Sequence, residues 1–278
     1  MAKGLALSIG LNAVDPKHYS GWSGPLTACE ADAQDMTQIA RSREFTVTTL
    51  LTRDATVETV KKKITEAAAT LKAGDTFMLT YSGHGGQLPD LNRDEPDGED
   101  ETWCLYNGEL VDDQLYALLG QFKEQVRVIV LSDSCHSGTI VKQAYYHGTV
   151  DARRSAMTGE LPRYRCMPPD VALATYRQNK TFYDPILKDR KIDERKEAVK
   201  ASVLLISGCQ DNQLSQDGAF NGLFTAQLLR VWADGDFKGG YRKLHSRIVR
   251  RMPPDQTPNY FRVGIRSAAF EASTPFTL

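Results

Sequence analysis

Five apolar segments of strand type recur along the chain, and stretches with helical periodicity separate them. The apolar segments span 4–11, 45–51, 76–82, 126–132 and 202–208. Most of them lack strict alternation of apolar and polar residues, which is typical of strands covered on both faces of a sheet. Helical patterns fall at 28–41, 57–71, 112–122 and 221–233. The alternation predicts an α/β fold with a central, mainly parallel sheet flanked by helices. The stretch "NYFRVG" at 259–264 predicts an added edge strand, which brings the sheet to about six strands.

Length and charge exclude several classes of protein. The chain has 278 residues, enough for one large domain or two small ones with a sizeable core. Lys and Arg (34) nearly balance Asp and Glu (35), so we expect no nucleic acid and no membrane as a partner. The N-terminal run "LALSIGL" is too short to cross a bilayer and lacks a following cleavage site, so it predicts a first strand and no signal peptide.

The cysteines indicate a reducing compartment. They are Cys29, Cys104, Cys135, Cys166 and Cys209. Their number is odd, their positions are scattered, and they form neither a C-x-x-C pair nor a zinc-binding spacing. Reduced thiols and a cytoplasmic location are therefore expected.

Reactive side chains follow two of the predicted strands. His84 lies in "TYSGHGG" just past the third strand, and Cys135 lies in "LSDSCHSG" just past the fourth. Ligands of open α/β sheets gather at the carboxyl ends of the strands, so neighbouring strands would let these two side chains face each other. A thiol nucleophile needs such a base, and the glycines around both residues let a substrate approach backbone N–H donors. The alternative is a small buried cysteine and a structural histidine. His136 adjoins Cys135 in sequence and is expected to point away.

Two motifs carry a resemblance to a known family. "YSGHGGQLPDLNRDEPDGEDE" and "DSCHSG" resemble the two signatures of metacaspases and of their bacterial relatives, the orthocaspases, in peptidase family C14. Their order matches that of the family, and His84 precedes Cys135 by 51 residues. The stretches "LTACEADAQDM" and "LLISGCQDNQLSQD" extend the resemblance over nearly the whole chain. It implies the caspase-hemoglobinase fold, a three-layer sandwich. The caspase signature Q-A-C-[RQG]-G is absent.

The resemblance implies a catalytic mechanism. Cys135 would attack the scissile carbonyl, His84 would protonate the leaving amine, and water would hydrolyse the thioester. Backbone N–H groups near Gly85 and Cys135 would stabilise the oxyanion. By analogy with the small subunit of the family, four polar residues after the fifth strand would line the cleft. They are Asp211, Asn212, Gln213 and Ser215.

Charge predicts the substrate preference. Asp133 precedes Cys135 by two residues, and the resemblance places three further residues in the primary specificity pocket. These three are Cys29, Asp32 and Ser82. Carboxylates in a pocket favour a cationic side chain, so we expect cleavage after Arg or Lys. In the alternative, Asp133 satisfies local backbone donors and Asp32 lies on a solvated helix face.

The acidic run "DLNRDEPDGEDE" raises the question of calcium. The register fits an EF-hand only in part, and Glu95 stands where the loop needs glycine, so the run does not predict an EF-hand. The resemblance points instead to a calcium site formed by Asp100, Asp112 and Asp113. A fourth acidic ligand expected soon after Cys135 is not evident there, and Lys142 lies in that stretch. The alternative is a solvated acidic loop.

A long interruption at 139–200 separates two predicted core strands. The resemblance divides the single domain, 1–278, into a large-subunit-like part (1–138), a linker (139–200) and a small-subunit-like part (201–278). Connections of this length are commonly functional. The linker is either a folded insertion that shields the site or a segment that the enzyme cuts itself. Candidate cut sites follow Lys142, Arg153, Arg154, Arg163 and Arg165.

These observations predict a cysteine endopeptidase that cleaves protein or peptide substrates after Arg or Lys. Calcium, self-cleavage or a regulatory partner would activate it. By resemblance it would be a monomer and would act in bacterial cell death or defence. Two other functions stay open: a catalytically silent interaction module that keeps the fold, and a different thiol hydrolase such as a thioesterase.

Overall fold

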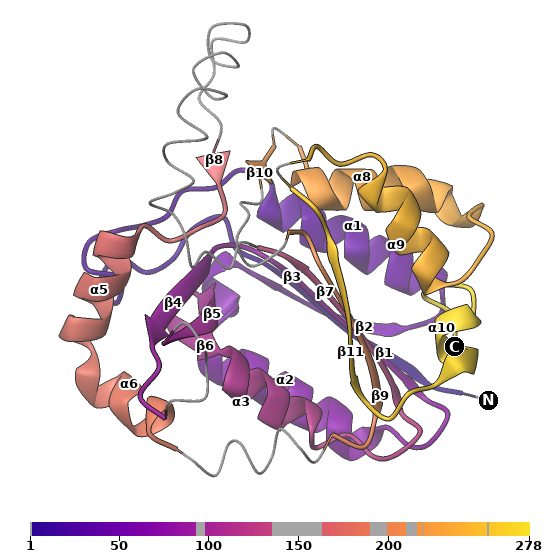
Figure 1. The fold of residues 1–278 in the computed structure, drawn as a ribbon, viewed down its shortest axis with the longest axis horizontal. Coiled ribbons are helices and arrows are strands. Elements are labelled where there is room, and N and C mark those ends of the chain that lie inside the picture. Colours follow the sequence, from indigo (N-terminus) through magenta and orange to yellow (C-terminus); the bar gives the residue numbers. More distant parts are fainter. Residues whose placement is uncertain are drawn as a thin grey trace, which may run out of the picture.

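The fold centres on a six-stranded sheet (Figure 1). The computed structural model describes residues 2–92, 98–134, 163–189, 199–209, 216–218, 220–254 and 256–278. In spatial order the strands are β11 (Asn259–Gly264), β9 (Ser202–Ser207), β7 (Arg127–Asp133), β3 (Thr76–Ser82), β1 (Gly4–Gly10) and β2 (Thr46–Leu51). Only β11 runs antiparallel to its neighbour within this sheet. The predicted α/β fold with a mainly parallel sheet is confirmed.

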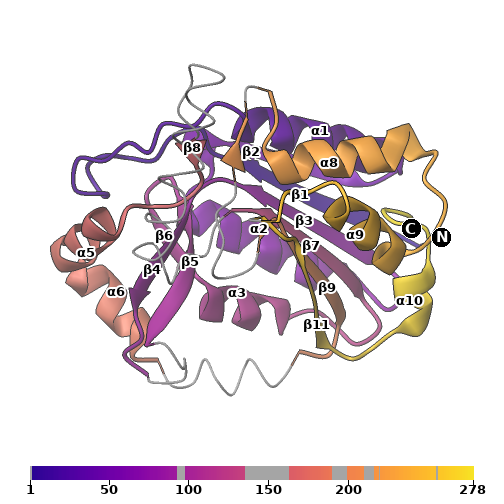
Figure 2. The same ribbon diagram turned by 45° about the horizontal axis from the view of Figure 1, so that its top comes forward.

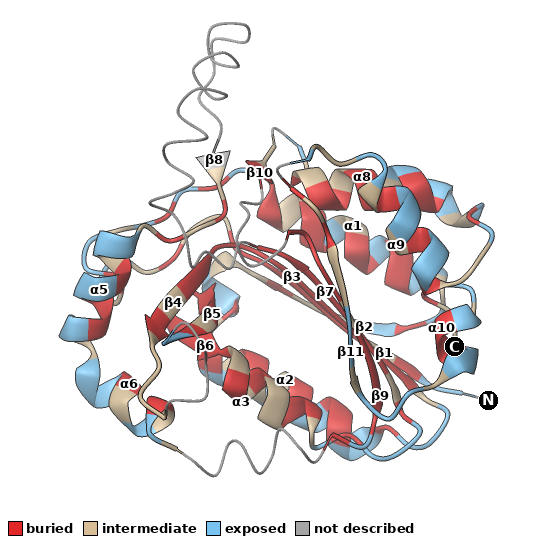
Figure 3. Cartoon of the chain, in the orientation of Figure 1, coloured by how far each residue is buried: buried red, intermediate tan, exposed pale blue. Residues whose placement is uncertain are grey.

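Helices cover both faces of this sheet, which explains the continuous apolar runs of its strands (Figure 2). One layer contains α2 (Val57–Thr70) and α3 (Asp112–Leu119). The opposite layer contains α1 (Cys29–Ser42), α8 (Leu223–Trp232), α9 (Tyr241–Val249) and α10 (Ala268–Ala272). Successive strand residues point to opposite faces, so Phe77 packs in the first layer and Met78 in the second. All seven residues of β3 are buried, as are most residues of its neighbours (Figure 3).

Local sequence patterns predict the helix ends within a few residues. The side chain of Thr56 caps α2 by accepting a hydrogen bond from the Thr59 N–H at 3.2 Å. The helix α3 ends at Leu119, three residues before the predicted end, and Phe122 beyond it packs into the core. Two 3₁₀ turns, η1 (Thr52–Asp54) and η2 (Ala233–Gly235), join the main elements.

A second, antiparallel sheet follows β3 in the chain. The sequence patterns did not predict it. It contains β4 (Gly85–Pro89), β5 (Glu99–Leu105) and β6 (Gly108–Val111). Against it lie α5 (Pro169–Gln178) and α6 (Lys180–Leu187), where Tyr183 and Leu187 pack on Leu88 and Val111. The described part of the 139–200 interruption is therefore folded. A two-residue strand, β8 (Arg163–Tyr164), pairs antiparallel with β10 (Gln216–Asp217).

No helix in the described parts of the chain has the length and apolar character needed to cross a membrane.

Candidate active site

The strand register places the two sequence motifs side by side. In the sheet, β3 and β7 are parallel neighbours, and Ser82 pairs with Asp133 at their carboxyl ends. His84 follows Ser82 by two residues, as Cys135 follows Asp133. Cys135 itself lies outside the described residues. The neighbouring strands on which the His84–Cys135 prediction depends are thus present.

His84 is buried and fixed in orientation. Its ring is 5 % exposed, and Nε2 lies 3.0 Å from the carbonyl oxygen of Gly24. Trp22 packs on the ring with a centroid distance of 4.7 Å, and the Tyr81 hydroxyl donates to the His84 carbonyl at 2.7 Å. Because a carbonyl can only accept, Nε2 carries the proton and the lone pair of the neutral ring is on Nδ1. Nδ1 is buried and hydrogen-bonds to no other described residue.

The protonation state of His84 suits a base. Burial lowers the pKa of His84 to about 4, and two backbone interactions, with the Gly24 carbonyl that accepts a hydrogen bond from the ring and with Cys166, only partly oppose this effect. The positive charge of Arg165 lowers the pKa further. A neutral imidazole with a free lone pair can accept a proton from a thiol.

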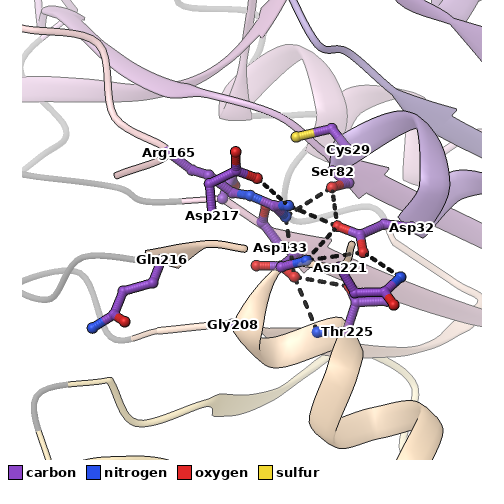
Figure 4. Close-up of polar contacts among 12 residues, drawn as sticks. Cys29, Asp32, Ser82, Asp133, Arg165, Gly208, Gln216, Asp217, Asn221 and Thr225 are labelled. Carbon is purple, nitrogen blue, oxygen red and sulfur yellow. Dashed lines mark hydrogen bonds and ion pairs between the residues drawn. The ribbon is translucent and has the colours of Figure 1, made fainter. Parts of the chain in front are cut away.

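Three carboxylates form an acidic pocket beside His84, and a guanidinium fills it (Figure 4). The acidic pocket consists of Asp32 on α1, Asp133 on β7 and Asp217 on β10. Arg165 Nη2 lies 2.8 Å from Asp32 Oδ2 and 3.0 Å from Asp217 Oδ1, and Nη1 lies 3.1 Å from Asp133 Oδ2. All four side chains are at most 2 % exposed. The alternative of a solvated position for Asp32 is therefore wrong.

Neutral groups complete the walls of the acidic pocket. The hydroxyl of Ser82 donates to Asp32 at 2.7 Å and accepts from Arg165 Nη1 at 2.8 Å. Asn221 donates to Asp32 at 2.9 Å, and Thr225 donates to Asp133 through its backbone N–H and its hydroxyl. Asp133 thus contacts the Arg165 guanidinium and also accepts from Thr225, a donor that lies 92 residues away in the sequence and is not local.

Burial changes the acidity of two pocket groups. Desolvation raises the pKa of Asp32 to about 6, although Arg165 opposes the rise. Burial also raises the pKa of Cys29 to about 12, so this sulfur is a neutral thiol in the wall. Three carboxylates face one guanidinium among the described residues, so the acidic pocket strongly favours a cation.

The backbone around Arg165 forms hydrogen bonds on both sides, as a strand added to a sheet would. The Gly85 N–H donates to the Arg165 carbonyl at 3.0 Å, and the Met167 N–H donates to the Gly85 carbonyl at 2.8 Å. On the other side, Tyr164 pairs with Gln216 and Arg163 with Asp217. The predicted oxyanion donor Gly85 therefore binds a peptide carbonyl of the chain itself.

The predicted calcium ligands also come together. One carboxylate oxygen from each of Asp100, Asp112 and Asp113 lies within 4.8 Å of the others, and Asp100 and Asp113 are buried. Hard oxygen donors in this arrangement fit calcium. The stretch after Cys135, where a fourth ligand was sought, lies outside the described residues.

Sequence reasoning missed several residues of the site. Asp217 contacts Arg165, Asn221 contacts Asp32, and Trp22 packs on the ring of His84. The signal for Asp217 was present, since it ends the motif "LLISGCQDNQLSQD". The cleft residues proposed from that motif, 211–213 and 215, lie outside the described residues.

Comparisons with known proteins agree with this geometry. The family model of the caspase domain, Peptidase_C14, matches residues 3–270. The chain is 29% identical over 257 residues to Metacaspase-1A of Aspergillus oryzae and 28% identical over 273 residues to Metacaspase-1 of Candida glabrata. These alignments cover 82% and 89% of the chain but only 58% and 65% of the fungal proteins.

A solved structure matches over almost the full length. The crystal structure of protein GSU0716 from Geobacter sulfurreducens superposes with a TM-score of 0.87 at 60% identity, covering 99% of this chain and 98% of that one. Together with the paired motifs at the ends of β3 and β7, these matches show that the chain belongs to the caspase-domain family of cysteine peptidases, family C14.

Proposed function

We propose that this protein is a cysteine endopeptidase that cleaves peptide bonds after Arg, and less efficiently after Lys. The observation that carries the proposal is the acidic pocket, in which three buried carboxylates hold a guanidinium. The two Nη atoms contact different carboxylates, which the fork of Arg allows. A Lys ammonium is a single point and cannot reproduce both contacts at once. An Asp side chain would meet three like charges.

The described residues have clear roles in the proposed reaction. His84 takes the thiol proton of Cys135 on Nδ1 as sulfur attacks the substrate carbonyl, and returns it to the leaving amine. The Gly85 N–H stabilises the negative charge on the carbonyl oxygen. Water then cleaves the thioester and regenerates the thiol. The acidic pocket fixes the residue before the cut bond, so the carbonyl is held beside the donor.

Fluorogenic peptides that differ only in the residue before the cleaved bond test this function. We expect hydrolysis rates in the order Arg, Lys, Asp, with Asp at background, and no hydrolysis by Cys135→Ala. Faster hydrolysis of the Asp peptide would refute the pocket assignment. Thioester hydrolysis without peptide hydrolysis would favour the thioesterase alternative, and no hydrolysis of any substrate would favour the interaction module.

We also propose that calcium binds at Asp100, Asp112 and Asp113 and promotes activity. The proximity of the three carboxylates supports this. Calcium would neutralise charge where β5 meets the start of α3. Isothermal titration should detect calcium binding to Cys135→Ala and its loss on Asp100→Asn. Unchanged binding in the Asp100→Asn variant, or activity unaffected by chelator and by calcium, would refute the respective part of the proposal.

A further inference from the structure

The segment 163–167 occupies the site as a substrate would, and its place defines one peptide bond. We propose that the uncut chain is blocked by its own Arg165 and that the enzyme activates itself by cutting the Arg165–Cys166 bond. This inference rests on the proposed function, because it needs an Arg-directed cysteine peptidase. It selects one bond from the five candidates in the linker.

The backbone contacts bracket that bond. The Arg165 carbonyl, on one side, accepts from the Gly85 N–H, and the Met167 N–H, on the other side, donates to the Gly85 carbonyl. Strand β8 continues the pairing with β10. An extended peptide that adds to strands on both sides is a common mode of peptide recognition. The backbone of Cys166 also interacts with His84, so the bond lies beside the proposed base.

The side chain of Arg165 leaves no room for a second cation. It is fully buried, and a Cβ atom at Gly222 would overlap its guanidinium. Asp32, Asp133 and Asp217 already contact it. A substrate Arg can therefore enter the acidic pocket only after Arg165 leaves.

The neighbouring side chains add a preference beyond Arg. Tyr164 packs against Cys209, and Met167 is 2 % exposed among Val14, Tyr19 and other apolar residues. Met167 fits because residue 86 is glycine: a Cβ there would lie 2.6 Å from the methionine methyl carbon. Substrates with an aromatic residue before the Arg and an unbranched apolar residue two places after it should be cut fastest.

An ion cluster that served stability alone would not account for the backbone arrangement. Buried ion pairs can be replaced by apolar side chains at little cost, so they are weak evidence for a purely stabilising role. A purely stabilising ion cluster also gives no reason for the Arg165 carbonyl to accept a hydrogen bond from the N–H of Gly85, the residue after His84.

The proposed step conserves atoms and charge. The Cys135 sulfur forms a bond to the Arg165 carbonyl carbon, the bond from that carbon to the Cys166 nitrogen breaks, and His84 passes the thiol proton to this nitrogen. Water then adds hydroxide to the same carbon and restores the thiol. The products are a carboxylate on Arg165 and an amine on Cys166.

The segment after the cut bond is anchored more firmly than the segment before it. After the bond, α5 and α6 are anchored: the Tyr183 hydroxyl accepts from the Glu109 N–H at 3.2 Å and lies 2.6 Å from His18 Nε2. Before it, the described contacts include the Arg165 ion pairs, its hydrogen bond to Ser82, the packing of Tyr164 on Cys209 and the pairing of β8 with β10 over only two residues. Cutting would therefore let Arg165 withdraw while the antiparallel sheet keeps its helices.

Intact-mass spectrometry tests the bond. The wild type, incubated with and without calcium, should yield fragments 1–165 and 166–278, whereas Cys135→Ala should stay intact. Arg165→Lys keeps the cation and should be cut at the same bond more slowly. Arg165→Gln should not be cut there, and the matched control Arg153→Gln, at another candidate site of the linker, should be cut normally. An intact wild type, or equal cutting of Arg165→Gln, would refute the self-cleavage.

Binding of agmatine, a small guanidinium compound, tests the blocked pocket without catalysis. Titrated into Cys135→Ala, agmatine should bind at least tenfold more weakly than to the double variant Cys135→Ala/Arg165→Gln. Circular dichroism verifies that both proteins are folded. If the double variant does not fold, limited trypsin digestion of Cys135→Ala replaces it: the buried Arg165–Cys166 bond should survive while exposed Lys and Arg sites are cut. Equal agmatine affinities, or ready trypsin cleavage after Arg165, would refute the blocked pocket.

Kinetics separate this inference from the proposed function. With an Arg-ending fluorogenic peptide, the wild type should show a lag that matches its self-cleavage, and Arg165→Gln should show none and start at least tenfold faster. If Arg165→Gln and uncut wild type hydrolyse the peptide at the same rate, the inference is wrong and the function stands. If neither hydrolyses it with or without calcium, the function itself fails.

Discussion

At the scale of single residues, the site depends on ionisable groups whose protonation state is set by their burial. His84 is neutral because burial lowers its pKa to about 4, and the hydrogen bond to Gly24 leaves the lone pair on Nδ1. Asp32 has the opposite shift, with a pKa raised to about 6, and it needs a cation beside it. A neutral imidazole next to an acidic pocket is the arrangement that the proposed function requires.

The His84 shift predicts a pH-dependent stability. The unfolded histidine binds a proton near pH 6.5, whereas the folded one does so only near pH 4. The free energy of unfolding should therefore fall as the pH drops from about 6.5 to about 4, and the loss is complete below that range. Urea denaturation of Cys135→Ala at several pH values measures the decline. His84→Gln in the same background should decline less, and an identical decline would contradict the buried neutral state.

Asp217 provides a second prediction, because the sequence did not single it out. Asp217→Asn removes a carboxylate whose Oδ1 lies 3.0 Å from Arg165 Nη2. Hydrogen bonds to charged groups contribute about 1.5–3 kcal/mol, so kcat/KM for an Arg peptide should fall by roughly 10- to 100-fold. The measurement uses the Arg165→Gln background, in which the pocket is open. The exposed Asp236→Asn serves as control, and a similar loss there would contradict the role.

At the scale of elements, the antiparallel sheet β4–β5–β6 connects the site to the folded insertion. Gly85 begins this sheet and contacts Arg165, while Glu109 on β6 contacts the insertion through Tyr183. Sequence patterns missed the sheet because its strands are four to seven residues long and include glycines and acidic residues. Pairing and packing against α5 and α6 stabilise these strands instead.

Glu109 predicts how this contact responds to pH. It is fully buried, and the Thr102 hydroxyl donates to it at 2.6 Å. Desolvation raises the pKa of Glu109 to about 7, so the fold favours the neutral acid. The stability that this preference contributes is present below about pH 4.5 and is lost as the pH rises through about 7. Glu109→Gln cannot ionise.

Thermal unfolding measures this effect. The melting temperature of Glu109→Gln relative to the parent, both in the Cys135→Ala background, should increase between pH 5 and pH 8. A difference that is constant over this range would show that Glu109 does not ionise within the fold as expected.

At the scale of the whole molecule, the central sheet ties together the two fragments that self-cleavage would produce. Strand β7 lies before the cut and β9 after it, and they pair in parallel over six residues. After cutting, the fragments should therefore remain one particle. Light scattering after size exclusion should give the mass of the intact chain, and two bands should appear only under denaturing conditions. Separation of the fragments in native buffer would contradict this prediction.

The sequence by itself determined the central sheet, the helices on its faces, and the positions of His84 and Asp133 at the ends of two strands, because apolar periodicity and strand-end motifs are local signals. The tertiary structure decided that these two strands, β3 and β7, are neighbours, because strand order depends on pairing between distant segments. Only the tertiary structure decided what fills the acidic pocket. Arg165 reaches Asp32 across 133 residues of sequence, Ser82 across 83 and Asp217 across 52. No local sequence signal distinguishes Arg165 from the other arginines of the linker, because its burial depends on three carboxylates that folding brings together from distant segments.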